Sequence, residues 1–396
     1  MLNQKTKRKI LLLTSILTLF SIVLTAQNNN EISTKPFTDG VNHWYNIPDK
    51  GNIVNPIPNQ PTYAESDYTK IADNIIYFQR DNGGWPKNYD MKAILNPEQI
   101  KAVVSSKSEF HTTIDNSTTY THIYYLAQVY TATKTKKYKN ACLKGIDFLL
   151  EAQYTNGGWP QYFPLEKGYS RHITFNDGAY MGVMSLLKKI ITNDPNFAFI
   201  DDKTKSKVTT AYQKGIDCIL NMQIQDQGKL TAWCQQHDEV TLLPAWARKF
   251  EPPSICNGES AEIVLFLMDI DNPNKKIIKS IQSAVKWFAD SKIYNTRIET
   301  FNAPEFDSSY HAKPVSVDRR VVIDSAAAPI WTRYYELETE KPLFCDRDSK
   351  YLYSLAEVGR ERRVGYAWYT YNPEKVLKLY PKWQKKWAPN NDILKP

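Results

Sequence analysis

The chain contains 396 residues, of which 50 are Lys or Arg and 42 are Asp or Glu, so its formal net charge is +8. This length allows one large domain or two smaller ones. The charge balance is too mild to indicate a nucleic-acid-binding protein. The five cysteines show no CxxC spacing, which implies no disulfide framework and argues against a zinc or iron–sulfur site. Cys234 and Cys256 bracket a loop and are candidates for one bridge in an exported protein.

Residues 1–26 have the pattern of a secretory signal peptide. A basic stretch at 5–9 (KTKRK) precedes an apolar run at 10–24, and Ala26 leads into a polar sequence. We predict cleavage after Ala26, a secreted or periplasmic protein, and no stable membrane insertion after cleavage. The alternative is a retained anchor, but the apolar run is short for a membrane-spanning helix.

The segment that follows the signal peptide is rich in Asn, Pro and Thr. We predict that residues 27–60 are irregular and that residues 61–396 form one domain. Residues 1–26 hold four basic and no acidic side chains, so the net charge of the rest is +4. That value suits an acidic ligand only weakly.

Beyond residue 60, an amphipathic helical stretch ending in glutamine recurs about every 70 residues. Further helical stretches lie between the copies. Such spacing predicts an all-α fold of stacked helical hairpins, which either continue as a solenoid or curl into a toroid. The copies are KIADNIIYFQ (70–79), KGIDFLLEAQ (144–153), KGIDCILNMQ (214–223) and, more weakly, SAVKWFADSK (283–292); the stretches between them are 119–133, 179–192 and 259–270.

The sequence NGGWP follows the first two copies, at 82–86 and 156–160. Asn, Gly and Pro at such a position are typical of a helix stop. Capping does not explain why a tryptophan is placed in both loops. Because the motif is duplicated, we favour a binding face, with Trp85 and Trp159 lining a ligand groove.

Two acidic motifs precede predicted helices about one repeat apart. Asp115 and Asn116 come before the helix at 119–133, and Asp177 comes before the helix at 179–192. Each aspartate has a purely structural interpretation as a helix N-cap. Equivalent hairpins would, however, bring both carboxylates to the same end of the fold. Such a pair suits either a Ca²⁺ site or general acid–base chemistry.

Two further segments place arginines among aromatic residues. In the long loop at 231–260, Arg248 lies between Trp246 and Phe250, so it either stacks on an aromatic ring or points into a groove. The segment 329–369 interleaves five arginines with tyrosines and tryptophans. Arginine binds carboxylates in a bidentate manner and aromatic rings stack on sugars, so an acidic polysaccharide would match both features.

Several of these segments together resemble the pectate lyases of polysaccharide lyase family 10, and the resemblance runs from about residue 65 to 385. It implies an incomplete α/α toroid, with long irregular loops forming a substrate groove, as the catalytic domain. It also implies a secreted, monomeric enzyme. The segments, in order, are IDNSTTYTHIYYLA, NGGWPQYFP, ITFNDGAYMGVM, WCQQHDEVTLLPAWARKFEPPSICNGES, KPLFCDRD and ERRVGYAWY.

The resemblance also implies a reaction, the Ca²⁺-dependent cleavage of de-esterified polygalacturonate by β-elimination to 4,5-unsaturated oligogalacturonides. Asp115 and Asp177 correspond to the residues that hold Ca²⁺ with the substrate carboxylates. Arg248 corresponds to the base that takes the C5 proton of the +1 sugar. The residues expected to contact substrate are Arg333, Arg347, Asn116, Lys87, Trp85 and Trp159.

Guanidinium groups normally stay protonated, so an arginine base needs help. A nearby cation disfavours the charged form, and an alkaline optimum is therefore expected. An arginine that only stabilises the enolate, with another group as base, is the alternative. Two other functions remain open from the residues: an inverting glycoside hydrolase using Asp115 and Asp177, and a non-catalytic exported glycan-binding protein.

Overall fold

The structure is a computed structural model that describes residues 32–47, 49, 51–308 and 314–394. The predicted signal peptide lies outside the described residues. The fold described below is that of the compact unit at Thr34–Pro396. Among the described residues no helix has the length and apolarity needed to cross a membrane.

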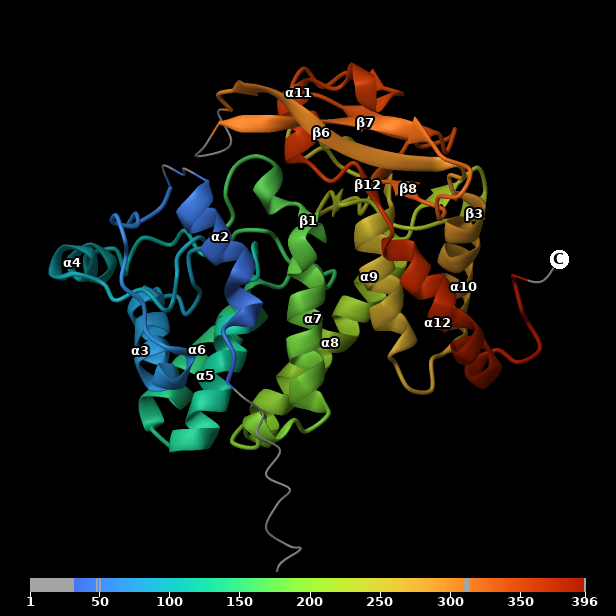
Figure 1. The fold of residues 1–396 in the computed structure, drawn as a ribbon. Helices are drawn as coiled ribbons and strands as arrows, with labels where there is room; N and C mark the ends of the chain where they lie inside the picture. The colour runs from blue at the N-terminus through green and yellow to red at the C-terminus, as the bar shows by residue number, and fades with distance from the viewer. Residues whose placement is uncertain (1–31, 48, 50, 309–313, 395–396) are drawn as a thin grey trace, which may run out of the picture. The chain divides into compact units, whose positions relative to one another are not determined.

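Helical hairpins stacked side by side form most of this unit (Figure 1). α5 packs on α6, α7 on α8, and α9 on α10, while α5, α7 and α9 also contact one another in succession. The predicted hairpin repeats are therefore confirmed. Their helices are α3 (Tyr68–Phe78), α5 (Tyr120–Thr133), α6 (Lys136–Ala152), α7 (Ala179–Ile191), α8 (Asp202–Met222), α9 (Asn257–Met268) and α10 (Lys275–Asp290).

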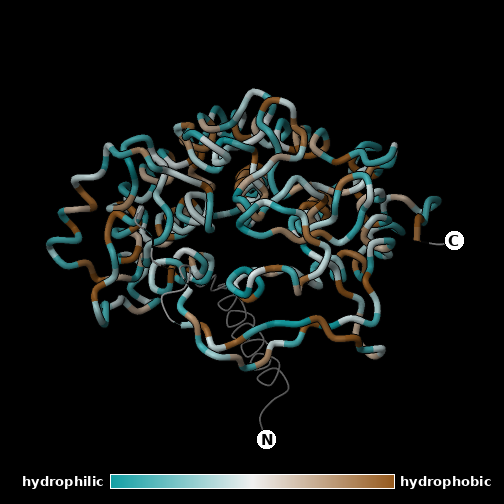
Figure 2. Tube along the Cα trace, turned by 90° about the horizontal axis from the view of Figure 1, so that it is seen from above, coloured by the Kyte–Doolittle hydropathy of each residue, from teal (hydrophilic) through white to brown (hydrophobic). Residues whose placement is uncertain are grey.

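Hydrophobic and hydrophilic stretches alternate along the chain in Figure 2. This alternation is what helices with one apolar face require. In α10, for example, Ile277, Ile281 and Phe288 are buried, while Lys279 and Lys286 on the other side are exposed. The core of the unit lies between two rows of helices. One row is α5, α7 and α9, and the other is α6, α8 and α10, and within each row neighbouring helices contact one another.

The tryptophans of the NGGWP loops fasten each loop to the helix before it. Trp85 Nε1 donates to the carbonyl of Ile75 (2.7 Å), and Trp159 Nε1 donates to that of Leu149 (2.8 Å). Trp233 and Trp331 make the same bond after the third and fourth copies, to Ile219 and Phe288. All four acceptors occupy the same position in their repeats, which confirms the weak fourth copy.

The glutamines and glycines of the motif connect each repeat to the next. Gln79 Nε2, which closes α3, donates to the carbonyls of Gly83 and Ala141, the latter in α6. Gly83 and Gly157 have φ of +93° and +97°, and a Cβ on Gly157 would lie 2.1 Å from the Lys214 carbonyl oxygen. Glycine is therefore required both by the backbone conformation and by the close approach of the next helix.

The expectation that Trp85 and Trp159 line a ligand groove is wrong, because both side chains are completely buried. A Trp with its indole N–H bonded and its ring inside the core cannot contact a polymer at the surface. The interpretation of NGGWP as a helix stop is therefore nearer to the structure than a binding loop. It did not predict that each Trp binds back to the helix before it.

The prediction of an all-α toroid is also wrong, because about 46% of the chain is helical and 14% forms strands in several sheets. The largest is the hairpin of β6 (Thr296–Phe306) and β7 (Val315–Ile323), which Figure 1 shows above the helices. A four-stranded sheet has the order β11-β10-β9-β5, and β1–β4, β12–β8 and β2–β3 form pairs. The short strands are β1 (Ile173–Thr174), β2 (Gln225–Asp226), β3 (Lys229–Leu230), β4 (Gln236–His237), β5 (Ile255–Cys256), β8 (Trp331–Thr332), β9 (Tyr334–Tyr335), β10 (Pro342–Cys345), β11 (Tyr351–Leu352) and β12 (Tyr369–Thr370).

Residues 27–60 were predicted to be irregular, but η1 (Lys35–Phe37) and α2 (Thr38–Asn46) lie within them. All five cysteines are free and buried, including the candidate pair Cys234 and Cys256. The remaining elements are α4 (Pro97–Ser105), α11 (Arg360–Gly365), α12 (Asn372–Trp387), η2 (Glu65–Asp67), η3 (Tyr169–Arg171), η4 (Asn176–Gly178), η5 (Pro195–Phe197) and η6 (Leu355–Glu357).

Candidate active site

The two acidic motifs lie in equivalent loops, immediately before α5 and α7. The backbone is left-handed at Asn116 (φ 48°) and at Asp177 (φ 50°), a conformation that Asn and Asp tolerate better than most residues. Neither aspartate acts as an N-cap: the cap of α5 is Thr119, and the cap of α7 is Gly178 without a side-chain bond. The structural explanation for these carboxylates therefore fails.

Asp115 forms a buried ion pair with Lys87. Lys87 Nζ lies 2.6 Å from Asp115 Oδ2, and the aspartate is 3% exposed. Burial lowers the pKa of Lys87, but the charge of Asp115 outweighs it and the net pKa is raised. Asp115 Oδ1 is buried and has no hydrogen-bond partner among the described residues. Asn116 is fixed behind it, donating to Asn88 Oδ1 (2.8 Å).

Asp177 lies in a more open setting and lines a cavity of about 470 Å³ together with Glu259, Glu262 and Arg333. The protein around Asp177, and then the negative charge of Asp115, raise its pKa to about 7, although Arg333 partly opposes this. Burial and the charge of Glu259 raise the pKa of Glu262 to about 7 as well. The lining of this cavity holds three carboxylates, Asp177, Glu259 and Glu262, and only one arginine.

Arg333 is the positive group of the cavity and is held from three sides. Its Nη2 donates to Glu259 Oε1 (2.6 Å), Gln235 Oε1 (2.9 Å) and Asn176 Oδ1 (3.2 Å). Asn176 Nδ2 in turn donates to Asp177 Oδ2 (2.5 Å). Arg333 is thus connected through one residue to the acidic motif before α7.

Arg248 is held by Glu251, three residues further along the loop. Its Nε donates to Glu251 Oε2 (2.8 Å) and its Nη2 to Oε1 (2.5 Å), while the Arg248 Cζ lies 4.9 Å from the centre of the Phe250 ring. Burial lowers the pKa of Arg248, but the bonds and charge of Glu251 outweigh it and raise the net pKa. Arg248 therefore both stacks on an aromatic ring and keeps its charge. Its Nη1 has no described hydrogen bond, so this nitrogen is left for a ligand.

A hydroxyl network joins Arg248 to Arg333. Tyr366 donates its hydroxyl to Glu251 Oε1 (2.8 Å), and its ring lies 4.6 Å from the Arg333 Cζ. The Tyr366 hydroxyl also lies 2.6 Å from that of Tyr334. The two arginines therefore share one set of supporting side chains.

Arg347 also packs against Phe250. Its Cζ is 5.5 Å from the Phe250 ring centre, and its Nε and Nη2 donate to Glu361 (2.9 and 2.7 Å). The side chain is 48% exposed, so it can reach a ligand beyond Arg248. The structure thus brings together Asp115, Lys87, Asp177, Arg248 and Arg333, with Arg347 at the margin.

The sequence analysis missed several groups that hold these side chains in place. Glu251, Glu259 and Tyr366 lay within quoted motifs, but nothing distinguished them from surface residues. Tyr169, in η3, was also missed. Burial raises the pKa of Tyr169, and the charges of Arg248 and Asp115 also act on it, so it lies within electrostatic reach of both. Only Glu251 could have been recognised from the sequence, because an acidic residue three positions after an arginine can form an ion pair with it.

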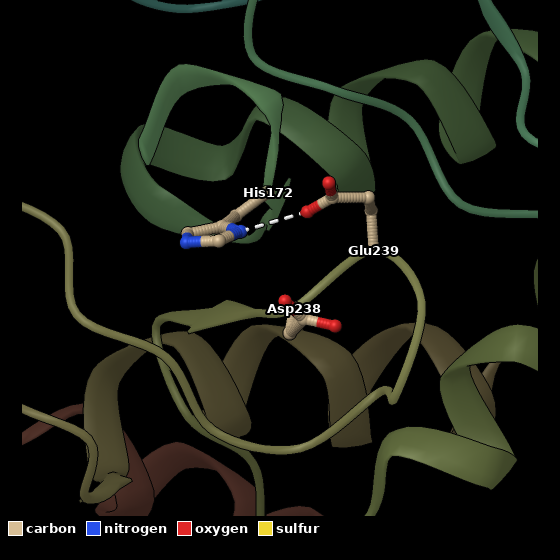
Figure 3. Close-up of side chains that lie close together, drawn as sticks. All are labelled: His172, Asp238 and Glu239. Atoms are coloured by element: carbon tan, nitrogen blue, oxygen red, sulfur yellow. Dashed lines mark hydrogen bonds and ion pairs between the residues drawn. The ribbon is translucent and has the colours of Figure 1, made fainter. Parts of the chain in front are cut away.

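A second cluster with ligands that metals accept consists of His172, Asp238 and Glu239 (Figure 3). His172 Nδ1 lies 2.9 Å from Glu239 Oε2, and Arg171 also pairs with Glu239. Asp238 Oδ1 accepts from the backbone N–H groups of Val240 and Thr241. These carboxylates are already satisfied by protein groups, so the cluster is better explained as a support for the loop.

The surroundings of Asp115 and Asp177 fit a hard cation better. Carboxylate oxygens are the ligands that Ca²⁺ prefers, and Asp115 Oδ1 is buried without a partner. A cation would also relieve the repulsion that raises the pKa of Asp177. Together with the guanidinium groups, these carboxylates define a site for an acidic ligand that carries carboxylates of its own.

Comparisons with known proteins identify the family of the chain. A model of the pectic acid lyase family matches residues 79–377. A family 10 polysaccharide lyase from Cellvibrio cellulosa is 29% identical, with a TM-score of 0.66, and the match covers 80% of this chain and 95% of the other. A mutant of a family 10 polysaccharide lyase from Cellvibrio cellulosa, in complex with trigalacturonic acid, is also 29% identical, with a TM-score of 0.67 and coverage of 80% and 96%. A search of curated proteins found no match.

The chain belongs to the pectic acid lyase family and is a pectate lyase of polysaccharide lyase family 10. The resemblance drawn from the motifs is confirmed. The hydrolase and binding-protein alternatives are set aside.

Proposed function

We propose that this enzyme cleaves de-esterified polygalacturonate by Ca²⁺-assisted β-elimination, with Arg248 as the group that removes the C5 proton. The observation that carries the proposal is Asp115, whose Oδ1 is buried and unpartnered while Asp177 lies close enough for their charges to interact. Two equivalent loops thus present carboxylates to one place. The trigalacturonic acid bound by the related lyase supports an oligogalacturonate as ligand.

Asp115 and Asp177 would hold the cation with the uronate carboxylate of the substrate. When bound, Ca²⁺ withdraws charge from that carboxylate and acidifies C5. Arg333 and Arg347 bind neighbouring uronates through their charge. The elimination breaks the C5–H and C4–O bonds and forms the C4–C5 double bond. The proton goes to Arg248, and the leaving oxygen takes a proton from water.

Arg248 is oriented for this role by Glu251, which occupies Nε and Nη2 and leaves Nη1 for the sugar. The same ion pair keeps Arg248 protonated in the resting enzyme. Since a base must be neutral before it accepts a proton, the rate should rise toward high pH. A cation nearby and the exclusion of water from Arg248 favour its neutral form.

The polymeric substrate agrees with export through the signal peptide at 1–26, and we propose a secreted or periplasmic monomer. If Ala26 is the cleavage site, mass spectrometry of the exported protein finds Gln27 as its first residue. Retention of residues 1–26 would contradict this.

Asp177→Ala tests the cation site. We expect turnover on polygalacturonate to fall by at least a hundredfold and to recover in part with excess Ca²⁺, because the lost group is a ligand. The melting temperature, measured on the same variant without Ca²⁺, should not fall. A loss of stability of about 1 kcal/mol with turnover nearly intact would instead be the result for a simple capping residue.

A further inference from the structure

Helix α2 is fixed to the rest of the fold by two buried aromatic side chains. Phe37, just before the helix, packs its ring 5.0 Å from that of His122, and Trp44 donates its indole N–H to the Val54 carbonyl (2.8 Å). Tyr45 adds a bond from its hydroxyl to Asp90 Oδ2 (3.1 Å). The helix lies outside the segment that the family model matches. These contacts nevertheless hold α2 in one defined position on the fold.

That position is against the loop that carries Asp115. A Cβ on Gly40 would lie 3.6 Å from the Asn116 carbonyl oxygen and 3.8 Å from the Asn88 backbone nitrogen. The helix backbone therefore lies against this loop, where a Cβ would be in ordinary van der Waals contact and a larger side chain would not fit. Asp39 is next to Gly40 and His43 is one turn later, and the charges of Lys87 and Asp115 act on both of them.

Asp39 and His43 form an ion pair across one helical turn, with 3.7 Å between Asp39 Oδ1 and His43 Nε2. Burial raises the pKa of Asp39, and so does the charge of Asp115, although His43 opposes both. The negative charge of Asp39 also reaches Asp177 and contributes to its raised pKa. Burial lowers the pKa of His43, while Asp39 and Asp115 oppose this shift and Lys87 and Arg248 add to it.

We infer that Asp39 is a third carboxylate of the cation site, adding negative charge to that of Asp115 and Asp177 and so tightening Ca²⁺ binding. The inference rests on the proposed cation site. The unpartnered, buried Asp115 Oδ1 is the independent sign that a ligand belongs there. Asp39 is a positioning residue for the cation, and α2 is the element that brings it to the site.

Calcium binding to the mature enzyme without substrate tests this inference. The melting temperature and calorimetric heat, measured over a CaCl2 series, give the Kd. Asp39→Asn should weaken Ca²⁺ binding by roughly tenfold, and added NaCl should reduce the difference because the effect is electrostatic. Gly40→Leu, which lifts α2 from the Asn116 loop, should weaken binding to a similar degree while Asp39 remains in the chain.

Asp217→Asn is the matched control, an exposed helical aspartate on α8, and its Kd should equal that of the wild type. If Asp39→Asn also binds like the wild type while Asp177→Asn binds weakly, Asp39 has no part in the site and the inference is wrong. If the wild type shows no saturable Ca²⁺ binding, the proposed cation site itself is wrong and the inference falls with it.

Discussion

At the scale of single residues, the proposed role of Arg248 as a base is the least usual, because a base must be neutral whereas the surroundings of Arg248 keep it charged in the resting enzyme. Glu251 stabilises the guanidinium charge, and Arg248 in turn lowers the pKa of Glu251 to about 2. A purely attractive arginine would have no need of this bidentate support. The ion pair fixes the plane of the guanidinium and directs one nitrogen to the ligand.

Arg248→Lys separates the two roles. Lysine keeps the charge, so electrostatic attraction of the polymer would survive, and KM should change little. A base at the position of Nη1 would be lost, and kcat should fall by about a thousandfold or more. Retention of more than about a tenth of wild-type kcat, a barrier change below roughly 1.4 kcal/mol, would remove Arg248 from the role of base.

Glu251→Gln is the companion variant. It removes the negative charge that raises the pKa of Arg248, so the rising limb of the pH–rate profile should move to lower pH. An unmoved limb would mean that Arg248 does not titrate in the reaction.

The raised pKa of Asp177 gives a second dependence on pH. Its folded-state pKa, about 7, lies above the usual 3.8, so the folded protein without Ca²⁺ holds this proton between about pH 4 and 7. The contribution of this proton to stability is therefore present at low pH and lost as pH rises through 7. Ca²⁺ competes with the proton, so we expect weaker Ca²⁺ binding at pH 6 than at pH 8. Equal Kd values at the two pH values, measured by calorimetry, would contradict the assignment.

At the scale of elements, the recurring Gly-Gly-Trp-Pro loop holds neighbouring hairpins together. Each loop returns its Trp to the helix before it, while its first glycine meets the carbonyl of the helix in the next repeat. The loops that carry Asp115 and Asp177 follow these contacts in the chain. The positions of the two carboxylates therefore depend on the packing of the Gly-Gly-Trp-Pro loops.

Gly157→Ala tests this packing. The added Cβ would meet the Lys214 carbonyl at 2.1 Å in a left-handed backbone, so unfolding should become easier by about 3 kcal/mol or more. Gly228→Ala has a similar φ of +78° with nothing within 4 Å, and should cost only about 1–2 kcal/mol. Chemical denaturation of both variants measures the difference. Equal losses would show that the close contact between repeats is unimportant.

The helices were predictable because their apolar spacing is local information. The burial of Trp85 was not, since it depends on Gly145 in another repeat leaving room for the indole ring. Strands of two residues carry no periodicity, and the β6–β7 hairpin follows the last repeat, where the helical pattern had been extended too far. In the candidate site, the motifs of the sequence were enough to propose Asp115 and Arg248. Glu251 and Asp39 could be proposed only from the fold, because only the fold shows which residues lie near them.

At the scale of the whole molecule, the site is assembled from loops that are far apart in the sequence. Lys87, Asp115 and Asp177 come from the first hairpins, whereas Arg248 and Arg333 come from the long loop and the small sheets. Positive and negative groups thus lie together in this site. A polymer that carries carboxylates can therefore be bound both directly by arginine and through a shared cation.

Incubation of the mature enzyme with polygalacturonate tests the central claim most directly. Elimination leaves a double bond conjugated with the carboxylate, so ultraviolet absorbance should rise with Ca²⁺ present and stop when a chelator is added. Excess Ca²⁺ should restore it. New reducing ends without ultraviolet absorbance, or a rate that a chelator leaves unchanged, would contradict Ca²⁺-assisted β-elimination at Asp115, Asp177 and Arg248.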